Sequence, residues 1–144
     1  MILATSGMMA QETVVSEGNW QVTANESNGK VTISYGSETL VAGNEAEWGL
    51  KNDKTTFNTL TDIVVTTNDY QDEFGTGKQL IVSGKTAQEP ITTITHTYYI
   101  YGDKDYLLTD VVLESDSKLE INYIAPVRST ASTQILDAGT NYFI

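Results

Sequence analysis

The sequence predicts an all-β protein folded as an antiparallel β-sandwich. Apolar and polar residues alternate over many short segments, turn residues separate these segments, and no longer window keeps a helical period. Thr, Val, Ile and Tyr are abundant, and these residues fit the half-buried surface of a strand. Short strands with turn signals at intervals of about 8–12 residues are typical of a sandwich or a barrel.

The first half of the chain is expected to form a meander of antiparallel strands. Residues 20–24 and 30–35 alternate, with a turn rich in Asn and Gly between them, and a third strand starts at residues 39–42. From residue 43 to residue 56 the pattern weakens, because polar residues surround Trp48. We therefore expect a surface loop or an irregular edge segment over residues 43–56.

The second half returns to strand character after this gap. Residues 61–67 and 79–83 have the pattern of strands, and the polar, glycine-bearing residues 68–78 between them are expected to form a loop. Residues 91–101 are the longest strand candidate, and the Asp- and Gly-rich residues 102–105 form a tight turn after it.

The end of the chain continues the series and then stops abruptly. Strands are expected over residues 106–114 and 119–124, after which Pro126 and Gly139 break the pattern. Residues 141–144 have the pattern of a strand cut off within an apolar run, which indicates a fragment of a longer chain.

Size and charge limit the organisation and the partners. A chain of 144 residues fits one domain, which we assign to residues 11–144. Its 8 Lys and Arg face 19 Asp and Glu, which gives a net charge of −11. Nucleic-acid binding needs clustered Lys and Arg, and the sequence has no such cluster, so we expect no nucleic-acid partner. An anionic membrane surface would also repel the chain. We interpret the acidity as solubilising surface charge, with calcium binding as the alternative.

The first ten residues predict export. Apolar residues followed by small residues resemble the tail of a signal peptide with cleavage after Ala10, so we expect a secreted or periplasmic protein. The alternative is an N-terminal tail without function. The sequence has no cysteine, so it can form neither a disulfide nor a Cys-based zinc site. It also has no run of the roughly 20 apolar residues that a membrane helix needs, so we expect no membrane insertion.

The reactive residue types do not form a convincing catalytic set. His96 is the sole histidine and lies within a predicted strand, which favours a hydrogen-bonded or exposed strand residue over a triad member. Asp72 and Glu73 are adjacent and would point to opposite faces, so they are unsuited to flank one bond. We therefore expect no catalytic residue, no metal and no cofactor.

Two further segments have a superficial likeness to ligand loops. Asp103 and Asp105 alternate as in a calcium loop, but the rest of that pattern is absent and a hairpin turn is favoured. Residues 75–78 do not match the spacing of a phosphate loop, and no helix follows them.

Trp48 is the best candidate for binding a ligand. It lies beside Glu45 and Glu47 in the expected loop, and an exposed indole ring could stack on a sugar. We therefore assign Trp48, Glu45 and Glu47 as candidate carbohydrate-binding residues. Core packing or domain docking is the alternative for each aromatic residue.

One longer stretch resembles a known family. Residues 72–80 (Asp-Glu-Phe-Gly-Thr-Gly-Lys-Gln-Leu), the strand ending Tyr-Ile-Tyr at residues 99–101, residues 105–108 (Asp-Tyr-Leu-Leu) and residues 122–126 (Asn-Tyr-Ile-Ala-Pro) are similar to the N-terminal β-sandwich of α-galactosidase-like and raffinose-synthase-like glycoside hydrolases. The resemblance implies a supersandwich-like domain ahead of a catalytic (β/α)₈ barrel. It also implies that the catalytic aspartates belong to the barrel and not to these residues.

The resemblance leads to an expected function. The chain would be the non-catalytic β-sandwich of a secreted bacterial hydrolase that degrades glycans. Its partners would be a downstream catalytic barrel and an oligosaccharide, and self-association into a homo-oligomer is a further option. The alternative is a free-standing carbohydrate-binding or adhesin-like module, and a calcium-stabilised structural module is third.

Overall fold

The computed structural model of the chain describes residues 11–51, 56–57 and 59–129. Within these residues the chain forms strands and no helix. The strands build two antiparallel sheets that do not close into a barrel, so the predicted all-β sandwich is confirmed. The strands are β1 (Glu12–Glu17), β2 (Trp20–Asn25), β3 (Val31–Tyr35), β4 (Glu38–Leu50), β5 (Thr56–Phe57), β6 (Thr61–Asp72), β7 (Gly75–Lys85), β8 (Ile91–Tyr101), β9 (Leu107–Ser115) and β10 (Ile121–Ser129).

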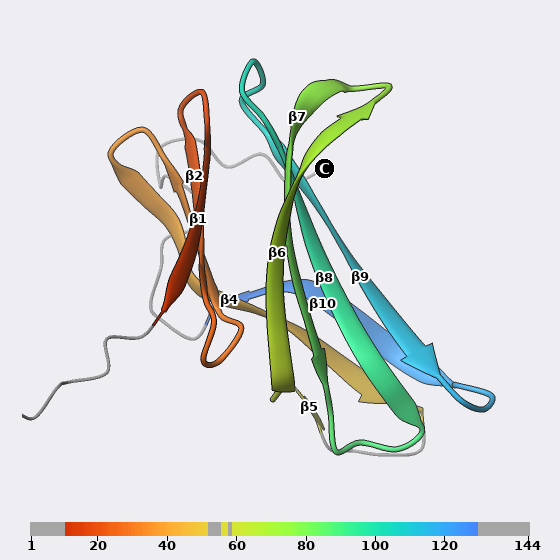
Figure 1. The fold of residues 1–144 in the computed structure, drawn as a ribbon. Coiled ribbons are helices and arrows are strands. Elements are labelled where there is room, and N and C mark those ends of the chain that lie inside the picture. Colours follow the sequence, from red (N-terminus) through yellow and green to blue (C-terminus); the bar gives the residue numbers. More distant parts are fainter. Residues whose placement is uncertain (1–10, 52–55, 58, 130–144) are drawn as a thin grey trace, which may run out of the picture.

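The two sheets have simple strand orders. The first sheet runs β1-β2-β3-β4-β10, with the short β5 paired to β4 beside this path, and the second runs β6-β7-β8-β9. The second sheet is a plain meander, because each strand pairs with its neighbour in the sequence. Figure 1 shows β1 and β2 beside the second sheet, while the long β4 runs diagonally across the lower part of the view and, with β10, overlaps the second sheet.

The main core lies between the inner faces of the two sheets. Every second side chain of a strand points inward, and the inward positions here are mostly aliphatic. Val22 and Val31 of the first sheet form one buried cluster with Leu80, Val82 and Ile100 of the second, and each is at most 1% exposed. Removal of this apolar surface from water is the main driving force that holds the sheets together.

The ends of the sandwich are closed by different contacts. At one end, the indole Nε1 of Trp20 donates to the carbonyl oxygen of Lys104 in the β8–β9 turn, at 2.9 Å. The β1–β2 turn also approaches that turn, since a Cβ added to Gly18 would lie 2.1 Å from the carbonyl oxygen of Gly102. Trp48, Ile91 and Ile94 form a second buried cluster, and Ile124 of β10 packs against it.

The predicted loop over residues 43–56 is wrong for its first part. Strand β4 continues to Leu50, and its inner positions are the buried Asn44, Ala46 and Trp48. Two of these inward residues are a small and a polar one, so the sequence lacks the apolar alternation that marks a strand. Tertiary packing around Asn44 and Trp48 replaces the missing local signal.

The predicted loop over residues 68–78 is also wrong. Strand β6 continues to Asp72 and β7 starts at Gly75, so only two residues connect them. Asp72 caps this turn, because its Oδ1 accepts the backbone N–H of Phe74 at 2.8 Å and that of Gly75 at 3.2 Å. The polar residues before and after the turn form the paired, solvent-exposed end of a long hairpin.

The remaining differences concern the two edges of the first sheet. Strand β1 was not predicted, because Val15 is its one buried hydrophobic residue. Pro126 does not end β10, since it falls at a register shift on an edge strand, where proline is tolerated. The signal segment at residues 1–10, Gly139 and the strand expected at residues 141–144 lie outside the described residues.

Two valines on adjacent strands test the assignment of the inner and outer faces. Val82 on β7 is 1% exposed and Val64 on β6 is 57% exposed. We expect Val82→Ala to lower the free energy of unfolding by about 2 kcal/mol, through lost burial and the cavity left behind, and Val64→Ala to change it by less than about 0.5 kcal/mol. Urea denaturation measures both values, and equal losses would contradict the two-sheet core.

Candidate functional site

Trp48 lies inside the sandwich. Its side chain is 1% exposed, packs against Ile91 and Ile94, and donates from Nε1 to Oε1 of Gln88 at 2.5 Å. The indole therefore offers no open face on which a sugar could stack. This position agrees with the core-packing interpretation and removes the surface loop on which the binding assignment rested.

Glu45 and Glu47 lie on the opposite face of β4. Both carboxylates bind the guanidinium of Arg128 on β10: Nη1 lies 2.6 Å from Oε1 of Glu45, and Nε contacts Oε2 of Glu47. Glu47 also accepts the hydroxyl of Tyr123 at 2.8 Å, and Lys30 lies 3.7 Å from Glu45. The two glutamates fasten β10 to β4.

The three predicted residues are therefore not brought together. Alternation along β4 places Trp48 inside and Glu45 and Glu47 outside, so they do not share a binding surface. The carbohydrate-binding role of these residues loses the geometric basis that the sequence suggested for it.

His96 belongs to a chain of buried and partly buried hydrogen bonds that crosses from the first sheet to the second. Asn44 Nδ2 on β4 donates to the hydroxyl of Tyr98 on β8 at 2.8 Å, and that hydroxyl lies 3.1 Å from His96 Nδ1. His96 Nε2 lies 2.8 Å from the hydroxyl of Thr109, which donates to the carbonyl oxygen of Thr97 at 2.9 Å. Every bond in this chain can run in one direction, from Asn44 to Thr97.

This direction assigns the protonation of His96. Thr109 donates onward, so it accepts from an Nε2–H, and the unprotonated Nδ1 accepts from Tyr98. Burial lowers the pKa of His96 to about 4, against a smaller opposite effect of Asp110, and burial raises the pKa of the Tyr98 hydroxyl. His96 is thus a neutral structural residue in a satisfied network, as the strand interpretation expected.

The other acidic candidates have structural partners. Asp72 caps the β6–β7 turn, while Glu73 lies exposed within it. Asp103 pairs with Lys104 at 3.0 Å in the β8–β9 turn, and this contact lowers the pKa of the Asp103 carboxyl. Across the described ranges, no group of three or more His, Asp and Glu is arranged to hold a metal ion. Residues 75–78 begin β7 and form no phosphate loop.

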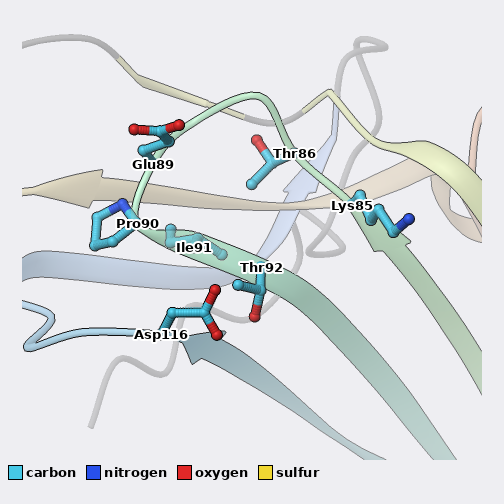
Figure 2. A pocket seen from close by; sticks show the side chains of 7 residues that line it. All are labelled: Lys85, Thr86, Glu89, Pro90, Ile91, Thr92 and Asp116. Carbon is cyan, nitrogen blue, oxygen red and sulfur yellow. The ribbon is translucent and has the colours of Figure 1, made fainter.

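A surface hollow of about 520 Å³ lies where the β7–β8 and β9–β10 connections meet. Figure 2 shows its lining: Lys85, Thr86, Glu89, Pro90, Ile91, Thr92 and Asp116. Lys85 forms an ion pair at 3.1 Å with Asp62, which does not line the hollow. The hydroxyl of Ser115, at the end of β9, donates to the carbonyl oxygen of Pro90 in the β7–β8 connection at 2.9 Å. The hollow combines one cation with two carboxylates, and His96, the sole histidine, is not among its lining residues.

The most organised surface is a group of aromatic rings on the outer face of the second sheet, which we call the tyrosine face. It consists of Tyr70, Phe74, Tyr99, Tyr101 and Tyr106, with ring centroids 4.9 Å apart for Tyr70 and Tyr99 and 6.4–6.5 Å apart for the contacts of Tyr101. These rings alternate with Tyr98 and Ile100, which point into the core. The tyrosine face is therefore turned away from the first sheet.

Carboxylates hold two of these rings in place. The hydroxyl of Tyr101 donates to Oδ2 of Asp72 at 2.6 Å, and that of Tyr99 donates to Oδ2 of Asp110 at 2.7 Å. Burial and the bond to Asp110 raise the pKa of Tyr99 to about 12, and burial and Asp72 raise the pKa of Tyr101 further. Burial raises the pKa of the Asp72 carboxyl, but hydrogen bonds from Tyr101 and the turn outweigh it and lower that pKa overall.

The sequence alone does not reveal the tyrosine face. The period-two spacing of Tyr99 and Tyr101 was a usable signal for one shared face. Their neighbours Tyr70 and Tyr106 come from other strands or turns, so the strand register had to be known before the group could be recognised.

Comparison of the chain with protein-family models, curated proteins and solved structures found no match. Among the described residues, no helix is long and apolar enough to cross a membrane. Any assignment of function therefore rests on the residues and their geometry.

The His96 network predicts a stability that depends on pH. His96 has a pKa of about 4 when folded and 6.5 when exposed, so the unfolded chain binds a proton first as the pH falls. Its contribution is complete above pH 6.5 and is lost between pH 6.5 and about 4, with a full size of about 3 kcal/mol.

Urea denaturation across this pH range measures the effect. His96→Gln removes the titrating group, so we expect its unfolding free energy to fall less steeply with decreasing pH than that of the wild type. Identical pH dependence in the two proteins would contradict the assignment of a neutral, buried His96.

Proposed function

We propose that this chain is the non-catalytic β-sandwich of a secreted, α-galactosidase-like, glycan-degrading hydrolase and supports a catalytic barrel. The residues that resemble this family occupy defined positions: residues 72–80 include the β6–β7 turn, residues 99–101 end β8, and residues 122–126 lie in β10.

The observation that carries this proposal is the edge strand β10. It lies at the end of the first sheet, and the strand order shows β4 as its one partner among the described strands. Ile121, Tyr123 and Val127 on β10 are 40%, 40% and 44% exposed. An edge strand with exposed apolar side chains favours pairing or packing with another chain segment, and proteins normally cover such edges. A following domain would supply that cover.

The partners of the described carboxylates and of the histidine favour a structural, non-catalytic role. The one histidine is buried in a satisfied network, and Glu45 and Glu47 are held by Arg128. Asp72 and Asp110 hold tyrosine hydroxyls. Carboxylates that are committed to the fold are unsuited to serve as a general acid and a nucleophile.

Assay of the purified chain with an aryl α-galactoside tests the non-catalytic role. We expect no release of the aryl group above the rate in buffer, because the carboxylates of Glu45, Glu47, Asp72 and Asp110 are bound to other side chains. Turnover at an enzyme-like rate would overturn the proposal. The genomic reading frame provides a second check: a barrel following Ile144 would support it, and an immediate stop codon would favour a free-standing module.

Binding of the separately expressed barrel tests the role of β10. We expect Val127→Lys to weaken this binding by about tenfold or more, because the charge would enter the covered edge. The matched control is Val14→Lys, since Val14 is 52% exposed on β1 at the opposite edge of the same sheet. Equal binding by the wild type and both variants, measured by calorimetry, would exclude β10 as the contact.

A further inference from the structure

The tyrosine face has the composition of a ligand site and takes no part in the contacts between the sheets. Phe74 and Tyr106 expose 53% and 39% of their surfaces, whereas Tyr101 between them is fully buried. The rings therefore form a surface with a covered centre and open flanks. Exposed aromatic rings gathered at one place indicate a contact surface more strongly than single exposed residues do.

Carboxylates fix the hydroxyl ends of two rings of the tyrosine face. Asp72 accepts the hydroxyl of Tyr101 and also caps the backbone of the turn that carries Phe74. Asp110 holds Tyr99 in the same way. Rings held in this way lose little conformational entropy on binding, which favours affinity.

The backbone beneath the rings is closely packed. Gly77 on β7 lies directly across from Tyr101, and a Cβ at Gly77 would come within 2.0 Å of the carbonyl oxygen of Ile100. Glycine at this position therefore allows β7 and β8 to approach closely beside Tyr101, and Tyr70 on β6 pairs with Gly77 from the other side.

Polar groups border the rings on the same face. Asn68 pairs with Gln79 across β6 and β7, and Gln79 pairs with Tyr99 across β7 and β8, so both amides lie on the outer face next to the rings. Amide and carboxylate groups donate to and accept from hydroxyls. Apolar rings bordered by a few such groups are the usual lining of a small-molecule site.

We propose that the tyrosine face binds a neutral pyranose ring. A pyranose has one face of C–H groups, which packs on an aromatic ring, and a rim of hydroxyls, which hydrogen-bond to amides and carboxylates. A purely apolar partner would leave the polar border without bonding groups, at a cost for each buried polar atom. An anionic sugar would meet Asp72, Asp110 and a net charge of −11.

This inference is separate from the proposed support of a barrel, because the tyrosine face belongs to the second sheet and β10 to the first. Failure of sugar binding would leave the β10 contact intact, and failure of the β10 contact would leave the sugar site intact.

Saturation-transfer NMR on the full chain tests the proposal. The probes are methyl α-galactoside, methyl β-glucoside and methyl α-mannoside at millimolar concentration, with galacturonate as the anionic probe. We expect transfer to the C–H protons of at least one neutral glycoside and none to galacturonate. We expect affinity to fall about tenfold in each of Phe74→Ala and Tyr106→Ala, while Tyr106→Phe keeps the ring and the binding.

The matched control is Tyr123→Ala on the first sheet, because Tyr123 is 40% exposed and Tyr106 is 39% exposed. Binding that survives in this control but not in Phe74→Ala and Tyr106→Ala supports the site. Because Phe74 and Tyr106 are exposed, we expect both alanine variants to keep the fold, and circular dichroism checks this. Three results would overturn the proposal: no transfer to any neutral probe in the wild type, equal transfer in the wild type and the alanine variants, or equal binding of galacturonate.

Discussion

The hydrogen bond between Asn44 and Tyr98 is the contact on which the arrangement of the two sheets depends. Asn44 lies on β4 and Tyr98 on β8, so their 2.8 Å bond crosses the interior from one sheet to the other. Both side chains are fully buried, and a buried polar group without a partner costs about 1–3 kcal/mol. Apolar packing alone would tolerate small shifts between the sheets. The polar chain from Asn44 through His96 to Thr97 permits one alignment, because each donor must meet its acceptor.

Asn44 also links this interior chain to the edge of the first sheet. Its Oδ1 accepts the backbone N–H of Arg128 at 2.8 Å, and its Nδ2 contacts the carbonyl oxygen of Pro126 at 3.2 Å. These bonds pair backbone groups of β10 at the register shift between Ala125 and Arg128, where Pro126 lies. The ion pairs of Arg128 with Glu45 and Glu47 then hold the same segment from the outer side. The position of β10, and with it the apolar edge that a partner would meet, therefore follows from β4.

Several of the described carboxylates and the histidine have structural roles, and this limits what the surfaces near them can offer. Carboxylates cap a turn, hold tyrosine hydroxyls or pair with arginine, and the histidine is inside. Among the described residues, the β10 edge and the tyrosine face each gather several exposed apolar or aromatic side chains. They belong to different sheets, so contact with a second domain at the β10 edge would not block a ligand at the tyrosine face.

The sequence by itself determined the fold class and the strands whose inward residues are aliphatic, such as β3 and the centre of β7, because alternation is a local property of the chain. It missed the second half of β4, where the inward positions are Asn44, Ala46 and Trp48, and it placed a loop where Asp72 closes a two-residue turn. Burial of Trp48 and the grouping of Tyr70 with Tyr99 and Tyr101 were decided by tertiary structure alone. The physical reason is that strand register, and not sequence spacing, sets which side chains from separate strands come into contact.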